Sequence, residues 1–391
     1  MDKKIRVALF MTMNTVMTKY SGILNLLEHM YYDDRFEVYV MPTHNVPDCV
    51  KSWLKTTKYS IINYSPSIVQ APFPNMYLDY VITIDPYYGP HCKGLGYRKW
   101  NVPIIYKEYG VTGIDGSKAL YDKDIYQRAY MIITDTQEDL INIRVATGHN
   151  CVVVGNPLFD YPVYQLKEES AYILPERPTV IWSPHCSICD DTENKITGGR
   201  FSTFLTYKDA MIEAVKMFPQ IDFVLKIHPY LTTRLDKAFK KGLIPKFSYE
   251  DWLSEITSYP NVKLMKTTDL YYPTFLKSSA MINDSISFVA EYLPTLRPML
   301  VLTDEGRSKY SDYAEKLIED CYYTAKDKYD LFDFLSGVVI GAGQGADKEP
   351  QLVFKRMEYL KRYKNTPEGI ASTNSQAISD YIVAIHRKYV G

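Results

Sequence analysis

The sequence lacks an excess of charge of either sign. Its 391 residues carry 45 Lys and Arg against 46 Asp and Glu, so the net charge at pH 7 is -1, and no extended basic block is present. Proteins that bind nucleic acid need basic surfaces to neutralise phosphates. We therefore expect no nucleic-acid partner.

Long apolar runs are also missing. No run approaches the roughly 20 residues that a membrane-spanning helix requires. The apolar run from Ile5 to Met11 contains Arg6 and is not followed by a small-residue cleavage site, so it fits a strand better than a signal peptide. We expect a cytoplasmic protein, with peripheral association at the inner face of the membrane or with other biosynthetic enzymes left open.

Cysteine is scarce, and its spacing gives weak support for a metal site. Of six cysteines, Cys186 and Cys189 form one close pair that follows His185. A structural zinc site normally has four ligands, and the sequence has no second close pair of Cys or His. We predict no metal ion, no other cofactor and reduced thiols.

The chain does contain alternating strand-like and helix-like segments. Hydrophobic content of 46% and charged content of 23% are typical of a globular protein, and the length fits two domains. Alternation of this kind predicts βαβ units around parallel sheets. The predicted strands are 5–11, 36–41, 59–64, 80–84, 103–106, 131–134, 151–154, 179–182, 223–227, 262–265, 281–283 and 299–302.

The order of these segments predicts an α/β fold of two doubly wound, Rossmann-type domains with a cleft between them. This is the GT-B architecture of glycosyltransferases. The expected first domain, on the acceptor side, is 1–155, and a proline-rich and charged linker covers 156–178. The expected second domain, on the nucleotide-donor side, is 179–365. We expect a C-terminal helix in 366–391, and we leave open whether it packs on the first domain.

Two strand ends in the second domain carry groups suited to a phosphate. One strand ends in Lys226-Ile227-His228-Pro229, and another leads into Asp284-Ser285-Ile286-Ser287 before a helix. Carboxyl ends of parallel strands face the ligand crevice, and helix N-termini bind anions. The alternative is that the histidine and the serines only cap helices. The predicted donor and nucleotide site comprises His228, Pro229, Asp284, Ser285, Ser287 and Glu291, with Asp284 orienting backbone amides and Glu291 accepting hydrogen bonds from a ribose.

The predicted catalytic residues are Glu108, His185 and His228. Glu108 ends a first-domain strand, where a carboxylate with a raised pKa can take a proton from an acceptor hydroxyl. The alternative is a salt bridge with Lys107 or with a surface lysine. His185 ends the first strand of the second domain and either contacts the donor phosphate, acts as an acid for the leaving group, or is a capping or exposed residue.

Five segments resemble those of CDP-glycerol glycerophosphotransferases, the teichoic-acid polymerase family. They are Gly155–Asp160 (Gly-x-Pro-x-x-Asp), Ile181–His185, Lys226–Pro229 (Lys-x-His-Pro), Asn283–Phe288 and Leu293–Pro298, in the family's order. The resemblance extends over roughly residues 100 to 305. It implies a GT-B fold, a CDP-activated donor, and phosphate binding by His228 and Ser287.

One segment departs from that family. Where the polymerases have Trp-His-Gly, this chain has Tyr106-Lys107-Glu108-Tyr109-Gly110, which looks more like the acidic-x-Gly motif of bacterial polysialyltransferases. Those enzymes use a CMP-activated sugar. The two resemblances together imply a cytidine-activated donor more firmly than they imply the group that it carries.

These observations lead to the expectation of a metal-independent GT-B transferase that moves a glycosyl or glycerophosphate group. The donor is CDP- or CMP-linked, and the acceptor is a saccharide or polyol phosphate, lipid-linked forms included, in bacterial capsule or teichoic-acid-like polysaccharide synthesis. Two alternatives stay open: a nucleotide-sugar epimerase of GT-B-like fold, and a non-catalytic nucleotide-binding module. Arg297 and Arg307 are further candidates for binding phosphate. The alternative is that each forms a surface ion pair, which is the commoner role of an arginine.

Overall fold

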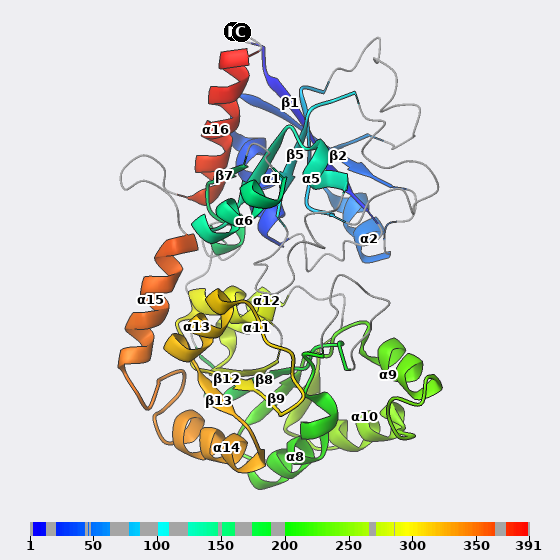
Figure 1. Ribbon diagram of the computed structural model, residues 1–391, viewed down its shortest axis with the longest axis vertical. Helices are drawn as coiled ribbons and strands as arrows, with labels where there is room; N and C mark the ends of the chain where they lie inside the picture. Colours follow the sequence, from blue (N-terminus) through cyan, green and yellow to red (C-terminus); the bar gives the residue numbers. More distant parts are fainter. Residues whose placement is uncertain are drawn as a thin grey trace. The chain divides into compact units, whose positions relative to one another are not determined.

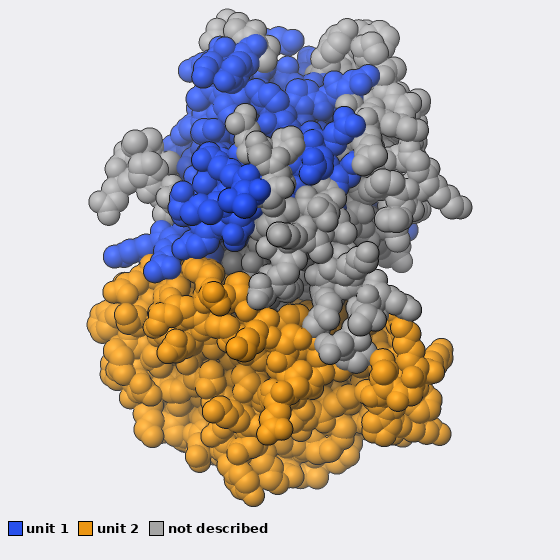
Figure 2. Space-filling view, in the orientation of Figure 1, with its two compact units in different colours: residues 1–111, 117–167, 361–391 blue, residues 112–116, 168–360 orange. Residues whose placement is uncertain are grey.

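The chain folds into two compact units, each built around one sheet. The computed structural model describes residues 3–12, 21–43, 46, 48–62, 78–86, 101–108, 124–147, 151–160, 174–188, 200–265, 271–284, 286–363 and 373–389. Unit 1 comprises residues 1–111, 117–167 and 361–391, and unit 2 comprises 112–116 and 168–360. Figure 2 shows the two units in different colours.

Unit 1 contains a parallel sheet of seven strands in the order β3-β2-β1-β4-β5-β6-β7. The central strand β1 pairs with β2 from Ile5↔Phe36 to Met11↔Pro42, and with β4 on its other side. The strands are β1 (Ile5–Met11), β2 (Phe36–Pro42), β3 (Ser60–Ile61), β4 (Tyr80–Thr83), β5 (Ile104–Lys107), β6 (Met131–Thr134) and β7 (Cys151–Val153).

Both faces of this sheet are covered, as the apolar composition of its strands requires. Alternate residues of β1 point to opposite faces: Val7 and Leu9 join one core cluster, and Ala8 and Phe10 join the other. Helices α1 (Ser21–Tyr32) and α16 (Asn374–Tyr389) cover the first face. Helices α5 (Asp124–Arg128) and α6 (Gln137–Thr147) cover the second, as Figure 1 shows.

Unit 2 contains a parallel sheet of six strands in the order β10-β9-β8-β11-β12-β13. Trp182 and Phe204 lie in its core with stacked rings 5.9 Å apart. The strands are β8 (Thr179–Ser183), β9 (Asp222–Leu225), β10 (Val262–Leu264), β11 (Ala280–Asn283), β12 (Met299–Leu302) and β13 (Tyr323–Ala325). The helices are α8 (Phe204–Met217), α9 (Leu231–Lys240), α10 (Tyr249–Thr257), α11 (Tyr272–Lys277), α12 (Ile286–Glu291), α13 (Asp312–Cys321) and α14 (Lys328–Asp333).

The prediction of two α/β domains with parallel sheets and a helical tail is confirmed. All twelve predicted strands exist, with shifted ends. Three elements of unit 2 were absent from the sequence-based description: β13, α9 and α10. The edge strand β13 has three residues and only one buried side chain, so it has no apolar run to reveal it. No helix among the described residues has the length and apolar character that crossing a membrane requires.

Each sheet changes its direction of growth at one point. In unit 1 the chain adds β2 and β3 on one side of β1, and then β4 to β7 on the other. In unit 2 the corresponding change lies between β8 and β11. Ligands of doubly wound folds bind beyond the carboxyl ends of strands at such switch points. The residues that follow β1 and β4, and those that follow β8 and β11, therefore need close inspection.

The C-terminal segment belongs to both units. Helix α15 (Gln351–Tyr363) begins in unit 2 and ends in unit 1, and α16 belongs to unit 1. The buried carboxylate of Asp160 accepts hydrogen bonds from the backbone N–H groups of Asn374 (2.9 Å) and Ser375 (2.7 Å) and from the Ser375 hydroxyl (2.7 Å). An acidic side chain far away in sequence thus satisfies free N–H groups in the first turn of α16.

This contact leads to a prediction about stability. Replacing Asp160 by Ala removes three hydrogen bonds to a charged group and leaves buried donors unpaired, so the free energy of unfolding should fall by about 3 kcal/mol or more. Urea denaturation followed by circular dichroism measures this change. The control is Asp34→Ala, which removes an exposed carboxylate 3.7 Å from Lys4 and should change stability by less than about 0.5 kcal/mol. Equal losses in the two variants would contradict the role given to Asp160.

Candidate active site

Asp284 lies at the switch point of unit 2, directly after β11. Its buried carboxylate accepts hydrogen bonds from His185 N (2.5 Å), Thr203 N (2.6 Å) and Thr203 Oγ1 (3.0 Å), and Tyr310 donates its hydroxyl to the Asp284 carbonyl at 2.7 Å. Burial raises the Asp284 pKa to about 6, against the opposite effect of these bonds. Both carboxylate oxygens are used by the protein. The geometry therefore supports the predicted orienting role of Asp284 more than direct contact with a nucleotide.

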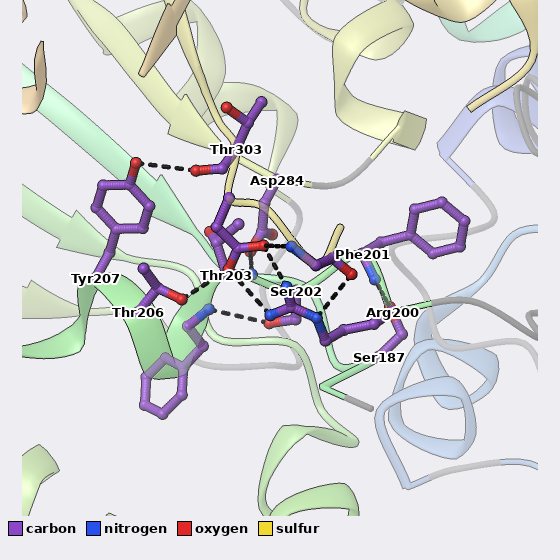
Figure 3. Close-up of polar contacts among 12 residues, drawn as sticks. Ser187, Arg200, Phe201, Ser202, Thr203, Thr206, Tyr207, Asp284 and Thr303 are labelled. Carbon is purple, nitrogen blue, oxygen red and sulfur yellow. Dashed lines mark hydrogen bonds and ion pairs between the residues drawn. The ribbon is translucent and has the colours of Figure 1, made fainter. Parts of the chain in front are cut away.

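The segment that Asp284 holds is also fixed from its other side. The Arg200 guanidinium pairs with both carboxylate oxygens of Asp304, and Thr206 donates to the same carboxylate at 2.7 Å. The backbone N–H of Phe201 donates to Ser187 Oγ at 3.2 Å. Figure 3 shows these contacts, which join loops after β8, β11 and β12. A rigid frame thus surrounds the residues that follow β8.

His185 and His228 follow the neighbouring strands β8 and β9, and their rings lie 5.4 Å apart. His228 Nδ1 accepts a hydrogen bond from Tyr230 N at 3.1 Å, so the proton of this ring is on Nε2. His185 Nδ1 lies 2.6 Å from Ser187 Oγ and 3.3 Å from Ser187 N, and the hydroxyl is able to accept from the ring or donate to it. The pair therefore presents at least one N–H donor, that of His228, at the carboxyl end of the sheet.

The charge near these rings is positive. Burial, helped by the nearby Arg234 guanidinium, lowers the His185 pKa to about 4, which keeps this imidazole neutral at physiological pH. Arg234 lies on α9, which begins three residues after His228. The Nε2–H donor of His228 and the nearby Arg234 guanidinium form a combination suited to an anion such as a phosphate.

Cys186 brings a sulfur atom to the same place, and this raises the question of a metal ion. The ligand atoms of His185, Cys186 and His228 all lie within 4.8 Å of one another, with Cys186 Sγ 3.8 Å from His228 Nε2. At His228, a metal ion bound at Nε2 would require that nitrogen to lose its proton while Nδ1 still accepts an N–H bond. That state is an imidazolate, which is unfavourable in water. The hydrogen-bond pattern of His228 therefore favours an anion over a cation.

A lysine and a glutamate lie further along the same edge of the sheet. Lys226 Nζ lies 4.8 Å and 4.6 Å from the ring centroids of Tyr271 and Phe288, and burial lowers its pKa to about 8, with the Glu291 charge acting in the opposite direction. The Tyr271 hydroxyl donates to Glu291 Oε2 at 2.5 Å. Glu291, the predicted ribose acceptor, is buried and already holds a tyrosine hydroxyl.

The remaining predicted residues of unit 2 occupy less informative places. Ser287 is half-buried in the first turn of α12, a helix of only six residues, and Pro229 is exposed. Ser285 lies outside the described residues. Arg297 donates to the carbonyl oxygen of Leu276 at 2.6 Å, and Arg307 pairs with Glu315 at 3.3 Å, so both arginines make structural contacts of the kind held open as the alternative to phosphate binding.

In unit 1, Glu108 directly follows β5 and is 2% exposed. Its carboxylate accepts hydrogen bonds from the Tyr126 hydroxyl (3.0 Å) and from Thr134 Oγ1 (2.6 Å). Burial and the neighbouring Asp139 and Asp135 charges raise the Glu108 pKa to about 8. A carboxyl group that titrates near neutral pH is suited to proton transfer.

Lys107 does not form the salt bridge with the Glu108 carboxylate that the alternative interpretation proposed. Its Nζ lies 2.5 Å from Asp135 Oδ1 and donates to the Glu108 carbonyl oxygen at 2.7 Å. Asn156 donates to the other Asp135 oxygen at 2.8 Å. Asp135 follows β6, so two adjacent strands end in buried carboxyl groups.

The switch point of unit 1 adds a third carboxyl group. Thr12 follows β1 and donates its hydroxyl to Asp85, which is buried just after β4. Since β4, β5 and β6 are neighbours, Asp85, Glu108 and Asp135 follow three consecutive strands of the sheet. Sequence reasoning selected only Glu108, although Ile84-Asp85 and Thr134-Asp135 show the same signal of a carboxylate after a short apolar run. Arg234 was missed because α9 was not predicted.

Comparison with known proteins relates the chain to others by fold only. No protein-family model matches the sequence, and no curated protein sequence matches it significantly. Among solved structures, it resembles S. aureus MnaA in complex with UDP, at 13% identity and a TM-score of 0.56, over 99% of this chain and 97% of that one. It also resembles UDP-GlcNAc 2-epimerase from Neisseria meningitidis bound to UDP-GlcNAc, at 12% identity and a TM-score of 0.54, over 97% and 100%.

A third similar structure is that of a variant of the wall teichoic acid polymerase TagF. Its identity to this chain is 15% and its TM-score 0.60, over 99% of this chain and 91% of that one. These similarities extend over nearly the whole chain. They confirm the predicted GT-B-like fold, whereas membership of the CDP-glycerol transferase family stays a prediction.

The histidine geometry predicts an anion site that metal ions do not occupy. Pyrophosphate should raise the melting temperature of the wild-type chain, because the Nε2–H group of His228 and Arg234 can bind it, and Zn²⁺ should not. His228→Ala should weaken the pyrophosphate effect roughly tenfold or more, since a hydrogen bond to a charged group contributes about 1.5–3 kcal/mol. Thermal-shift titrations measure both. Lys263→Gln, at an exposed lysine on β10, is the control. Stabilisation by Zn²⁺ that is lost in His228→Ala would contradict the tautomer assigned to His228.

Proposed function

We propose that the chain is a GT-B transferase that uses a nucleotide-activated donor. The observation that carries this proposal is the pair of imidazoles of His185 and His228 at the ends of adjacent strands, with the His228 proton on Nε2 and the charge of Arg234 nearby. In this proposal the donor's phosphates bind there, and the imidazoles stabilise the charge that develops on the departing nucleotide. Glu291 and Ser287 extend the nucleotide site along the same edge of the sheet.

The proton-transfer group of the proposal is Glu108. Its pKa of about 8 leaves it partly ionised near neutral pH, so it can accept the proton of an acceptor hydroxyl as the bond to the donor forms. Tyr126 and Thr134 orient its carboxylate. We also propose the finer identity: a cytidine-linked donor, a saccharide or polyol-phosphate acceptor, and a place in bacterial cell-surface polysaccharide synthesis. The support for these is the sequence resemblance over residues 100 to 305.

A second candidate function is that of a nucleotide-sugar epimerase. The specific observation in its favour is the series of buried carboxyl groups after β4, β5 and β6, which supplies more than one acid or base for a single bound sugar. An epimerase needs no acceptor. The two candidates therefore differ in whether the donor alone is converted to product.

The donor assignment predicts a ranking of nucleotides. CMP or CDP should raise the melting temperature more than UDP, GDP or ADP, and saturation at a hundred times the dissociation constant should stabilise the chain by about 2.7 kcal/mol. A thermal-shift screen measures the ranking. A clear preference for UDP would contradict the cytidine assignment, and conversion of a UDP-sugar without acceptor would identify an epimerase.

If Glu108 is the catalytic base, Glu108→Gln should lower turnover. Its free energy of unfolding relative to wild type should also increase as the pH rises. Turnover should fall by about 10²–10⁴-fold, because an amide cannot accept the proton. The folded-state pKa of Glu108 is raised from 4.5 to about 8, so the native chain binds this proton more tightly than the unfolded chain. Protonated Glu108 therefore stabilises the native chain by at most about 5 kcal/mol. This stabilisation is fully present below pH 4.5 and is lost as the pH rises to 8.

Urea denaturation of wild type and Glu108→Gln at pH 5 and pH 9 tests this linkage. The variant does not titrate, so its stability relative to wild type should be greater at pH 9 than at pH 5. Glu138→Gln, in the first turn of α6, serves as the matched control and should show no such pH dependence. Unchanged turnover in Glu108→Gln would place the catalytic base elsewhere, even if the stability difference is found.

A further inference from the structure

The end of α9 forms a rigid, protruding turn in unit 2. Leu231, Leu235 and Ala238 bury one face of the helix. Gly242 then adopts φ +69, and the N–H groups of Gly242 and Leu243 donate to the carbonyl oxygens of Phe239 (2.9 Å) and Ala238 (3.0 Å). This is the Schellman pattern, which ends a helix and returns the chain along its last turn. We call residues 237–246 the α9 tip.

The α9 tip exposes apolar side chains that no core contact requires. Phe239 is 45% exposed and Leu243 is 54% exposed, and Pro245 is exposed beside them. Since the Schellman bonds join residues 238 and 239 to residues 242 and 243, the two large apolar side chains lie at the same end of the helix. Burying an exposed phenylalanine or leucine in an apolar phase is favourable, so this pair is suited to insertion into another phase or partner.

Positive charge is concentrated around this apolar pair. Lys237, Lys240, Lys241 and Lys246 are all exposed. No acidic residue lies between Asp236 and Glu250, although the whole chain has a net charge of -1. The tip is thus a short surface where lysines alternate with apolar groups, and it stands out in a chain of balanced charge.

We propose that the α9 tip docks on the surface of an anionic lipid bilayer. Surface-bound membrane segments combine lysines, which attract anionic headgroups, with a few aromatic or aliphatic side chains that enter the interface. Charge complementarity and the small number of exposed apolar groups both fit this occupant. The attraction of each lysine to such a surface corresponds to about a fivefold gain in binding.

Docking at this place has a geometric consequence for the candidate active site. Helix α9 has ten residues and begins three residues after His228, so at 1.5 Å per residue it extends about 15 Å from the histidine end to the tip. A docked tip holds the His228 end of α9 within about this distance of the bilayer. This distance suits an acceptor whose apolar part stays in the membrane. The docking itself does not depend on the proposed function.

Vesicle co-sedimentation of the full chain tests the inference. The protein should bind vesicles of phosphatidylglycerol and phosphatidylcholine at low salt, bind pure phosphatidylcholine vesicles at least about tenfold more weakly, and be released by 1 M NaCl. The variant K240E/K246E should weaken binding to the anionic vesicles by about 25-fold or more. F239S/L243S should weaken it by at least about fivefold, because the apolar contacts are lost.

The matched control is K263E/K277E, which reverses two exposed lysines elsewhere in unit 2 and changes the net charge equally. It should bind anionic vesicles within about threefold of wild type. Melting temperatures of all variants should stay close to the wild-type value, since the replaced side chains are exposed. Absence of binding to anionic vesicles, equal binding to neutral vesicles, or an equal loss in the control variant would each overturn the proposal, the last because net charge alone would then explain binding.

Discussion

The candidate site of unit 2 depends on one buried carboxylate. Asp284 stands where the sheet changes direction, and its two oxygens accept the N–H groups of His185 and Thr203. Loops that follow different strands are thereby held in one arrangement. A buried charge with a pKa raised to about 6 is costly, and the cost is tolerated because the loop N–H groups would otherwise be unsatisfied. The position of His185 follows from this constraint, because the same loop carries it.

The two units place different chemical groups at the carboxyl ends of their parallel strands. In unit 2 the strand ends carry the imidazoles of His185 and His228 and the amine of Lys226, with Arg234 nearby and with Asp284 in its structural role. In unit 1 they carry carboxyl groups, of which Glu108 has a pKa near 8. Nucleotide-activated chemistry requires a group that binds anions and a group that moves protons. The proposed function assigns the first role to the histidines of unit 2 and the second to Glu108 of unit 1.

Much of the fold could be predicted from the sequence, because buried parallel strands are short apolar runs that need no partner to be recognised. The run Ile5–Met11 is a clear case. Helix α9 was missed because its buried face has only three residues among charged ones, and β13 because two of its three residues are not buried. Glu108, His185 and His228 were selected as candidates because each follows such a run. Asp85 and Asp135 carry the same signal, but their significance depends on the strand order, which brings β4, β5 and β6 together and which sequence alone does not give.

The low sequence identity to the similar structures is consistent with a shared fold that carries different functional side chains. At 12–15% identity, a polymerase, a UDP-bound protein and a UDP-GlcNAc-bound epimerase share the fold of this chain. What the fold determines is where strands end and therefore where functional groups can meet. What it leaves open is which side chains stand there. The choice between the two proposed functions therefore rests on the side chains that follow β4, β5, β8 and β9. In this chain, the adjacent imidazoles of His185 and His228 and the raised pKa of Glu108 are properties of those residues and not of the fold.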